Sequence, residues 1–209
     1  MTAKIKLNAA SGGGSFSLQA PSSSANNRVM TLPDTADGTV LTTTNPKSKS
    51  IIQVVSEVNK AYAAKDSVAN TKYDDLGFNC QITPSSTSSK IILFYSITLS
   101  AEVVGREVTL TPTFNSGSGV TEFDLGEVDG NKTRINTSDV QPNAGVQRSF
   151  NISFHCEHSP SNTNQHTYSF RHTVQHDGAF IVRNQSFSSP NNVTSSRSVS
   201  RITAMEVAG

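Results

Sequence analysis

The sequence predicts an all-β protein, an antiparallel β-sandwich that follows an extended N-terminal segment. About eight to ten short apolar runs recur roughly every 8–12 residues between turn-forming Gly, Pro, Asn and Asp, a spacing typical of two-sheet sandwiches. Helical periodicity is almost absent. A jelly roll is the first expectation. An immunoglobulin-like sandwich is the second, because the chain has no Trp for the Cys–Trp–Cys pattern of true immunoglobulin domains.

The clearest pattern lies in residues 148–175, where two runs alternate apolar and polar side chains around a polar loop. The members that share one side of each run are Phe150, Ile152, Phe154 and Cys156, then Tyr168, Phe170, His172 and Val174. A chain reversal at residues 161–163 predicts an antiparallel hairpin that pairs Cys156 with Tyr168 and Phe150 with Val174.

Residues 91–99 form the strongest strand pattern, and their two apolar faces predict a central strand buried on both sides. Pro112 places the strand in residues 108–114 at an edge or a bulge. Residues 61–69 permit one helical turn or a loop, and residues 136–145 indicate a polar loop. The final strand, residues 202–207, is expected inside a sheet near a chain–chain contact. Other short strands are expected in residues 51–58, 78–82, 133–135 and 179–182.

Residues 1–46 differ from the rest of the chain. Their apolar pieces are too short, and too often broken by Gly and Pro, to build an independent core. Such a segment gains order by pairing with other chains or with a partner surface. The predicted organisation is therefore an N-terminal β segment, residues 1–46, and a head domain, residues 47–209.

The composition narrows the function classes. Hydrophobic residues make up 34% of the chain and the 13 Gly add about 6%, giving roughly 40% against a usual 45–50%. We interpret this thin core as a sign that part of the chain stays extended and that neighbouring copies complete the core. The net charge of +1 gives no basic field for nucleic acid, and no apolar run reaches the roughly 18 residues of a membrane span. No apolar run of a secretory signal follows Lys4 and Lys6.

Histidines and cysteines are the first candidates for chemistry. The five histidines are His155, His158, His166, His172 and His176. The first three could meet near the expected hairpin tip, but residues three apart on a strand point to opposite faces, which favours a wet cluster near a subunit contact over a zinc site. We expect His172 on the buried face. Cys80 and Cys156 form no CxxC pair and are expected as buried thiols, with a disulfide as the alternative.

Catalytic patterns are weak. Serines are frequent, but no G-x-S-x-G motif occurs, and alternation buries the sulfur of Cys156. Asp124, Glu127 and Asp129 fit a solvated turn better than a glycosidase or calcium site. We therefore expect no catalytic residue, no cofactor and no metal ligand.

Several strings of the sequence resemble small tail-fibre and virion structural proteins of marine tailed phages, notably cyanophages. These strings are KIKLNAA (4–10), FSLQAP (16–21), MTLPD (30–34), IIQVV (51–55), ITPSSTSSKI (82–91) and ITAMEV (202–207). The resemblance covers both ends of the chain and little of residues 94–198. It implies a homotrimeric fibre in which residues 1–46 attach to other virion proteins and residues 47–209 form a jelly-roll head similar to C1q/TNF heads.

These expectations suggest a non-enzymatic virion protein, a short trimeric tail fibre whose head binds a host-surface glycan or protein. Candidate receptor-binding loops are residues 115–119, 136–145, 159–165 and 186–196. The candidate contact residues within them are Asn115, Ser118, Asn136, Asn143, Asn162, Asn164, Gln165, Asn191 and Asn192.

Two alternatives remain open at this point. One is a head fibre, capsid decoration or tail-junction protein without a receptor. The other is a tailspike glycan hydrolase, a class that is usually much longer and carries clustered acidic residues, and this sequence has neither feature. The expected location is the virion, on the tail or capsid surface, after synthesis in the host cytoplasm, with no nucleic-acid partner and no membrane insertion.

Overall fold

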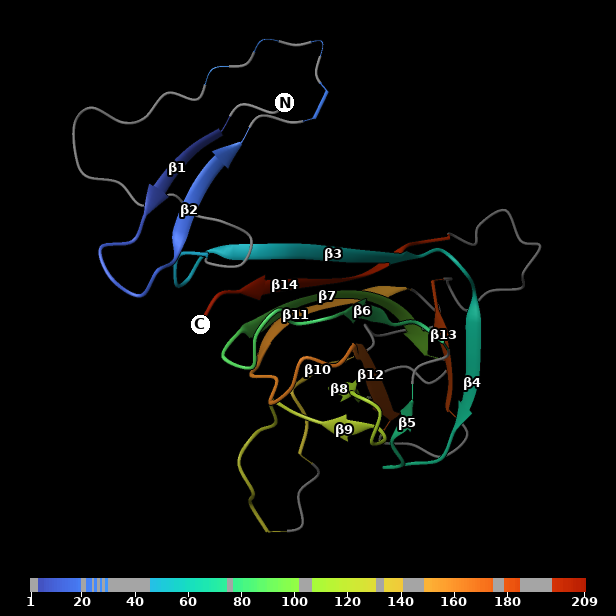
Figure 1. Ribbon diagram of the computed structural model, residues 1–209. Helices are drawn as coiled ribbons and strands as arrows, with labels where there is room; N and C mark the ends of the chain where they lie inside the picture. The colour runs from blue at the N-terminus through green and yellow to red at the C-terminus, as the bar shows by residue number, and fades with distance from the viewer. Residues whose placement is uncertain are drawn as a thin grey trace, which may run out of the picture. The chain divides into compact units, whose positions relative to one another are not determined.

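The computed structural model is all-β and divides into two compact units, Met1–Val40 and Leu41–Gly209. It describes residues 4–19, 22–23, 25, 27, 29, 46–74, 77–101, 107–130, 134–140, 149–174, 179–184 and 197–209. Within those ranges no helix occurs, and so none that is long and apolar enough to cross a membrane. The described part of the first unit is an antiparallel hairpin of β1 (Lys4–Asn8) and β2 (Ser15–Gln19). The second unit consists of two antiparallel sheets (Figure 1).

Sheet I contains the first and last strands of the second unit. In it β14 (Ser200–Val207) lies between β3 (Ile51–Asn59) and β7 (Lys90–Ala101), and β11 (Phe150–His158) pairs with β7. β13 (Ala179–Arg183) pairs with the far end of β7 and with β4 (Ala63–Ser67). The predicted interior position of the final strand is therefore confirmed.

Sheet II is built around β8 (Glu107–Asn115) and β12 (His166–Val174), which pair along almost their whole length. The free side of β12 pairs with β5 (Tyr73–Asp74) and β6 (Cys80–Ile82). β8 also pairs with β9 (Thr121–Glu122) and β10 (Thr137–Val140). In Figure 1, β8, β9, β10 and β12 of sheet II lie below β3, β14, β7 and β11 of sheet I.

The pairing between strands is nested. β3 pairs with β14, β6 with β12, β7 with β11, and β8 with β9 and β10, so these pairs alternate between the two sheets. A chain folded back on itself and then rolled in this way is a jelly roll. The predicted fold class, an antiparallel jelly-roll sandwich, is confirmed.

The predicted hairpin in residues 148–175 is wrong in its pairing. β11 pairs with β7, with Phe154 opposite Tyr95, whereas β12 pairs with β8, with Phe170 opposite Pro112. The seven-residue loop 159–165 is long enough to cross the roughly 10 Å between packed sheets. The faces were predicted correctly, since the alternating side chains of both runs, Phe154 excepted, are buried. Those faces meet across the sandwich instead of side by side.

Smaller predictions also fail. Residues 61–69 contain strand β4 instead of a helical turn or a loop. β10 lies within the predicted polar loop 136–145, and residues 134–135 of the predicted strand 133–135 are not in a strand. Pro112 lies inside a central strand, but its carbonyl accepts a hydrogen bond from Phe123 N (3.3 Å) at the point where β8 passes from β10 to β9. The proline nitrogen points to the same side of β8, at the place between β10 and β9, so the missing N–H costs no hydrogen bond of the sheet.

The core fills the space between the sheets. Leu93, Ile97 and Leu99 of β7 are at most 2% exposed. The ring of Tyr95 stacks on Phe154 with centroids 4.5 Å apart. Both cysteines are free and buried, and burial raises the pKa of Cys80 to about 11. Sulfur atoms held in this way are inert thiols of the core.

Candidate functional site

The outer face of sheet I carries exposed apolar side chains. Val54, Met205 and Ile92 lie opposite one another on β3, β14 and β7, so they form one row across three strands. Phe94 follows in the next row and is 47% exposed, and Val54 is 54% exposed. We call these apolar side chains the apolar face; its members are Ile51, Val54, Val58, Ile92, Phe94, Met205 and Val207. The polar Ser56 and Thr203 share the row of Phe94, and Arg201 lies opposite Val58. The expectation that β7 is buried on both sides is therefore wrong for a single chain.

Polar side chains border the apolar face on the β11 side. His155 lies opposite Phe94, with ring centroids 6.3 Å apart, and Glu157 lies opposite Ile92. Lys90 and Glu157 form an exposed ion pair at 3.2 Å. An apolar centre with a polar border is the usual composition of a protein–protein interface.

The hairpin of the first unit has a second uncovered apolar surface. Ile5 pairs with Leu18 and Leu7 with Phe16, so all four side chains lie on one face, and each is at least 42% exposed. The opposite face carries Lys6 and Ser17. A two-stranded hairpin of this kind is at most marginally stable alone, so this face requires a covering surface.

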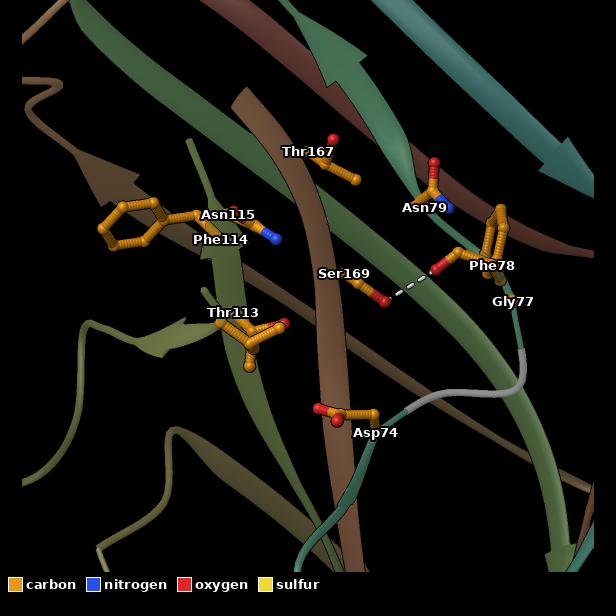
Figure 2. Close-up of a pocket in the computed structure, with 10 residues that line it drawn as sticks. Asp74, Gly77, Phe78, Asn79, Thr113, Phe114, Asn115, Thr167 and Ser169 are labelled. Atoms are coloured by element: carbon orange, nitrogen blue, oxygen red, sulfur yellow. Dashed lines mark hydrogen bonds between the residues drawn. The ribbon is translucent and has the colours of Figure 1, made fainter. Parts of the chain in front are cut away.

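Sheet II carries a pocket of about 210 Å³ on its outer face (Figure 2). Its floor is a square of four polar side chains, because Ser169 lies opposite Thr113 and Thr167 lies opposite Asn115 on the neighbouring strand. The remaining residues that line it come from the segment before β6, from β5, from β8 and from the turn before β9: Asp74, Gly77, Phe78, Asn79, Phe114 and Val120.

The hydrogen-bonding groups of the pocket are only partly used. Ser169 Oγ donates to the carbonyl of Phe78 (2.7 Å), and Asn115 Oδ1 accepts from Gly117 N (2.8 Å). Gln81 Nε2 donates weakly to Thr167 Oγ1 (3.4 Å). Within the described part of the chain, the side chains of Asn79 and Thr113 make no hydrogen bond.

An ion-pair chain lies beside this pocket. Arg171 Nε contacts Asp74 Oδ1 at 2.7 Å and Arg171 Nη1 contacts Glu122 Oε1 at 3.0 Å, while Lys72 Nζ binds Glu122 Oε2 at 2.5 Å. Burial alone would raise the pKa of Glu122, but hydrogen bonds from Lys72 and Arg171 outweigh it and lower that pKa. Asp74, the one charged residue among the described residues that line the pocket, is therefore paired with Arg171.

His158 and His166 form an aromatic cluster with Phe114, Phe123 and Tyr168, in place of the expected wet cluster. His158 and His166 have centroids 5.6 Å apart, and His158 Nδ1 shares a hydrogen bond with the Tyr168 hydroxyl (2.7 Å). Burial, and to a smaller extent His166, lower the pKa of His158 to about 4. His155 points outward from sheet I and does not join them. In the described ranges no three His, Cys, Asp or Glu residues are placed to hold a metal ion; His176 lies outside those ranges.

The structure brings two of the predicted receptor loops to one end of sheet II. Residues 115–119 and 159–165 flank the paired ends of β8 and β12 at Asn115 and Thr167. Asn115 is half-buried in the pocket, Ser118, Asn164 and Gln165 are exposed, and Asn162 is half-buried. Asn136 donates to the carbonyl of Asp124 (2.9 Å) away from this end. Asn143, Asn191 and Asn192 lie outside the described residues.

Sequence reasoning missed the other pocket residues. Asn79, Thr113, Thr167 and Ser169 lie on or beside strands where polar residues normally face solvent. The outward alternation Thr111–Thr113–Asn115 on β8 was a usable signal. It identifies a polar sheet face, whereas the partner strand comes only from the fold.

Comparisons with known proteins give little further information. No protein-family model and no curated protein matches the chain. A solved structure of infectious bursal disease virus, Gx strain, has 13% identity and a TM-score of 0.39 over 94% of this chain and 42% of that chain. The VP2 subviral particle of the same virus has 11% identity and a TM-score of 0.24 over 92% and 50% of the two chains. The chain thus spans half or less of these proteins, and at these TM-scores the likeness carries no argument.

Proposed function

We propose that this chain is a non-enzymatic structural protein of a phage virion, a short tail fibre whose head is a homotrimer and binds the host surface. The observation that carries the proposal is the apolar face of sheet I. Four of its side chains, Ile51, Val54, Val58 and Phe94, are more than 40% exposed in a single chain. Exposed apolar side chains gathered on one face of a folded domain in this way favour assembly.

The energy available from covering this face is substantial. Burying a Val, Ile, Met or Phe side chain fully contributes about 1.5–3 kcal/mol, so completing the burial of seven partly exposed ones contributes roughly 7 kcal/mol per chain. Copies arranged around a rotation axis share such faces in a closed assembly. The resemblance to trimeric phage fibres favours three copies.

The hairpin β1–β2 supplies the attachment function in this proposal. Its apolar face of Ile5, Leu7, Phe16 and Leu18 would dock on another tail or capsid protein, as expected for residues 1–46. At the head, the loops 115–119 and 159–165 would contact a host glycan or protein. Their Ser and Asn side chains provide adaptable hydrogen bonds. The alternative, a capsid decoration or tail-junction protein without a receptor, shares the same assembly face.

Light scattering on the purified chain tests the assembly. We expect three times the chain mass of 22.3 kDa. Val54→Asp places a charge in the apolar face and should reduce the mass to that of one chain, because an unpaired buried charge costs several kcal/mol. Val128→Asp is the matched control, since Val128 is 73% exposed and lies in a loop off this face. A monomeric native chain, or a trimeric V54D variant, would contradict the proposal.

The receptor role needs its own experiment. Labelled trimer should bind host cells and compete with phage adsorption. If it does neither while imaging of the particle places the protein on the tail or capsid, the receptor-free alternative holds and the assembly proposal stands.

A further inference from the structure

We infer that the pocket on the outer face of sheet II binds one uncharged sugar residue of a surface glycan. The inference rests on the proposed host-binding function and gives it a location and a ligand class. It starts from the square of Thr113, Asn115, Thr167 and Ser169, whose side chains rise side by side from two paired strands (Figure 2).

The pocket offers both donors and acceptors to a ligand. Asn79 keeps its whole amide and Thr113 its hydroxyl, because neither makes a hydrogen bond to the described part of the chain. Thr113 is only 2% exposed, so it presents its hydroxyl at the base of the pocket. Asn115 uses only Oδ1, toward Gly117, and therefore still presents its amide N–H groups. Ser169 donates to Phe78 and can still accept. A sugar hydroxyl donates one hydrogen bond and accepts others, so a mixed set of this kind fits a polyol.

Charge at the pocket argues against ionic ligands. Among the described residues no Lys, Arg or His lines it, so phosphate, sulfate and acidic sugars find no counter-charge there. The carboxylate of Asp74 is paired with Arg171 at 2.7 Å, which also makes a cationic ligand unfavourable. Val120, 46% exposed, adds apolar surface for the C–H face of a sugar ring.

The size of the pocket sets the extent of recognition. At about 210 Å³ it is smaller than the 300–1,000 Å³ usual for sites that enclose drug-sized ligands. One ring fits, and the rest of a chain would leave toward the loops 115–119 and 159–165. Binding of a single sugar is therefore weak, and three pockets per trimer would act together on a cell surface.

The experiment uses the purified full-length protein and saturation-transfer NMR with glucose, galactose, mannose, rhamnose and N-acetylglucosamine, and with glucuronic acid as a charged comparison. At least one neutral sugar should bind with a millimolar Kd. Thr113→Val and Asn79→Ala should each weaken it about fivefold, the effect of losing one hydrogen bond. Thr111→Val is the matched control, because Thr111 lies two residues earlier on the same strand, is as buried as Thr113, and does not line the pocket.

The outcomes separate the pocket from the proposed function. Equal binding by the native, T113V and N79A proteins, no binding of any neutral sugar, or binding of glucuronic acid alone would overturn the pocket inference. If the protein still binds host cells in those cases, the ligand of the loops is a protein or a charged glycan, and the host-binding function stands. Sugar binding that T113V weakens, in a protein that binds no host cells, supports the pocket and refutes the receptor role.

Discussion

Glu206 gives the sharpest test of how the head is held together. Its side chain is fully buried on β14 and pairs with no cation in the described part of the chain. Oε1 accepts from Ser85 N, Ser85 Oγ and Ser89 Oγ, each at 2.7 Å, and Oε2 accepts from Gln53 Nε2 at 2.5 Å. One carboxylate thus joins the last strand to β3 and to the loop before β7. We predict that Glu206→Gln destabilises the head.

The cost follows from the donors around the side chain. A glutamine at this position keeps an acceptor toward Ser85 and Ser89 but turns N–H groups toward Gln53, whose amide also donates to Thr83 O (2.7 Å). Losing one charge-assisted hydrogen bond and leaving a buried donor unpaired costs about 2 kcal/mol. For a domain of this size that lowers Tm by about 4–8 °C. Glu57→Gln on β3 is the control, because Glu57 is exposed and should change stability by less than about 0.5 kcal/mol.

The pH dependence adds a second readout. Burial alone would raise the pKa of Glu206, but hydrogen bonds from Gln53, Ser85 and Ser89 outweigh it and lower that pKa. A lowered folded-state pKa contributes stability above the unfolded value of about 4.3, and this contribution is lost as the pH falls further. In urea unfolding at fixed protein concentration, the difference between native and E206Q proteins should therefore be largest at neutral pH and shrink below about pH 4. Equal stability at pH 7 would refute the reasoning.

Two further predictions concern other buried polar groups. NMR titration should give His158 a midpoint near pH 4. The free energy of unfolding should fall as the pH drops from about 6.5 toward 4, because the unfolded chain binds this proton at a higher pH than the folded chain does. A midpoint near 6.5 would contradict the buried placement. Asn184, with φ of 60° and full burial, bonds Asn59, Ala61 and Ser200. Asn184→Gly should lower the free energy of unfolding, measured in urea, by about 2–3 kcal/mol because hydrogen bonds are lost. Asn184→Ala should lower it by about 1 kcal/mol more, because Ala disfavours positive φ. Equal stability of the two variants would contradict the backbone part of this prediction.

Local patterns predicted the faces of the strands better than their partners. The alternation of Tyr168, Phe170 and Val174 correctly identifies the buried face of β12. It cannot choose between β11 and β8 as the neighbour, because both carry matching apolar faces and the loop 159–165 permits a hairpin or a crossover. Pairing partners in a jelly roll are decided by contacts far apart in sequence.

The hardest residues to predict were those whose exposure or contacts depend on distant parts of the fold. Ile92 and Phe94 suggested a strand buried on both sides, and the structure leaves their face open in one chain. Glu206 and Asn184 gave no local signal, since each depends on a neighbour from a distant segment. The pocket residue Thr113 gave only the signal of a polar sheet face. The candidate loops contributed Asn115 to the pocket and no other lining residue named in advance.

The pairing of β3 with β14 determines when the head can form during synthesis. The earliest strand of the sandwich has its partner near residue 200, so the ribosome has made almost the whole domain before sheet I can close. Until then the edges of β3 and β7 are open to the same strands of nascent neighbours. Folding and association of these chains are thus expected to be late, slow and coupled. Assembly would then begin between nascent chains on the same polysome, and mispairing of their strands is most probable there.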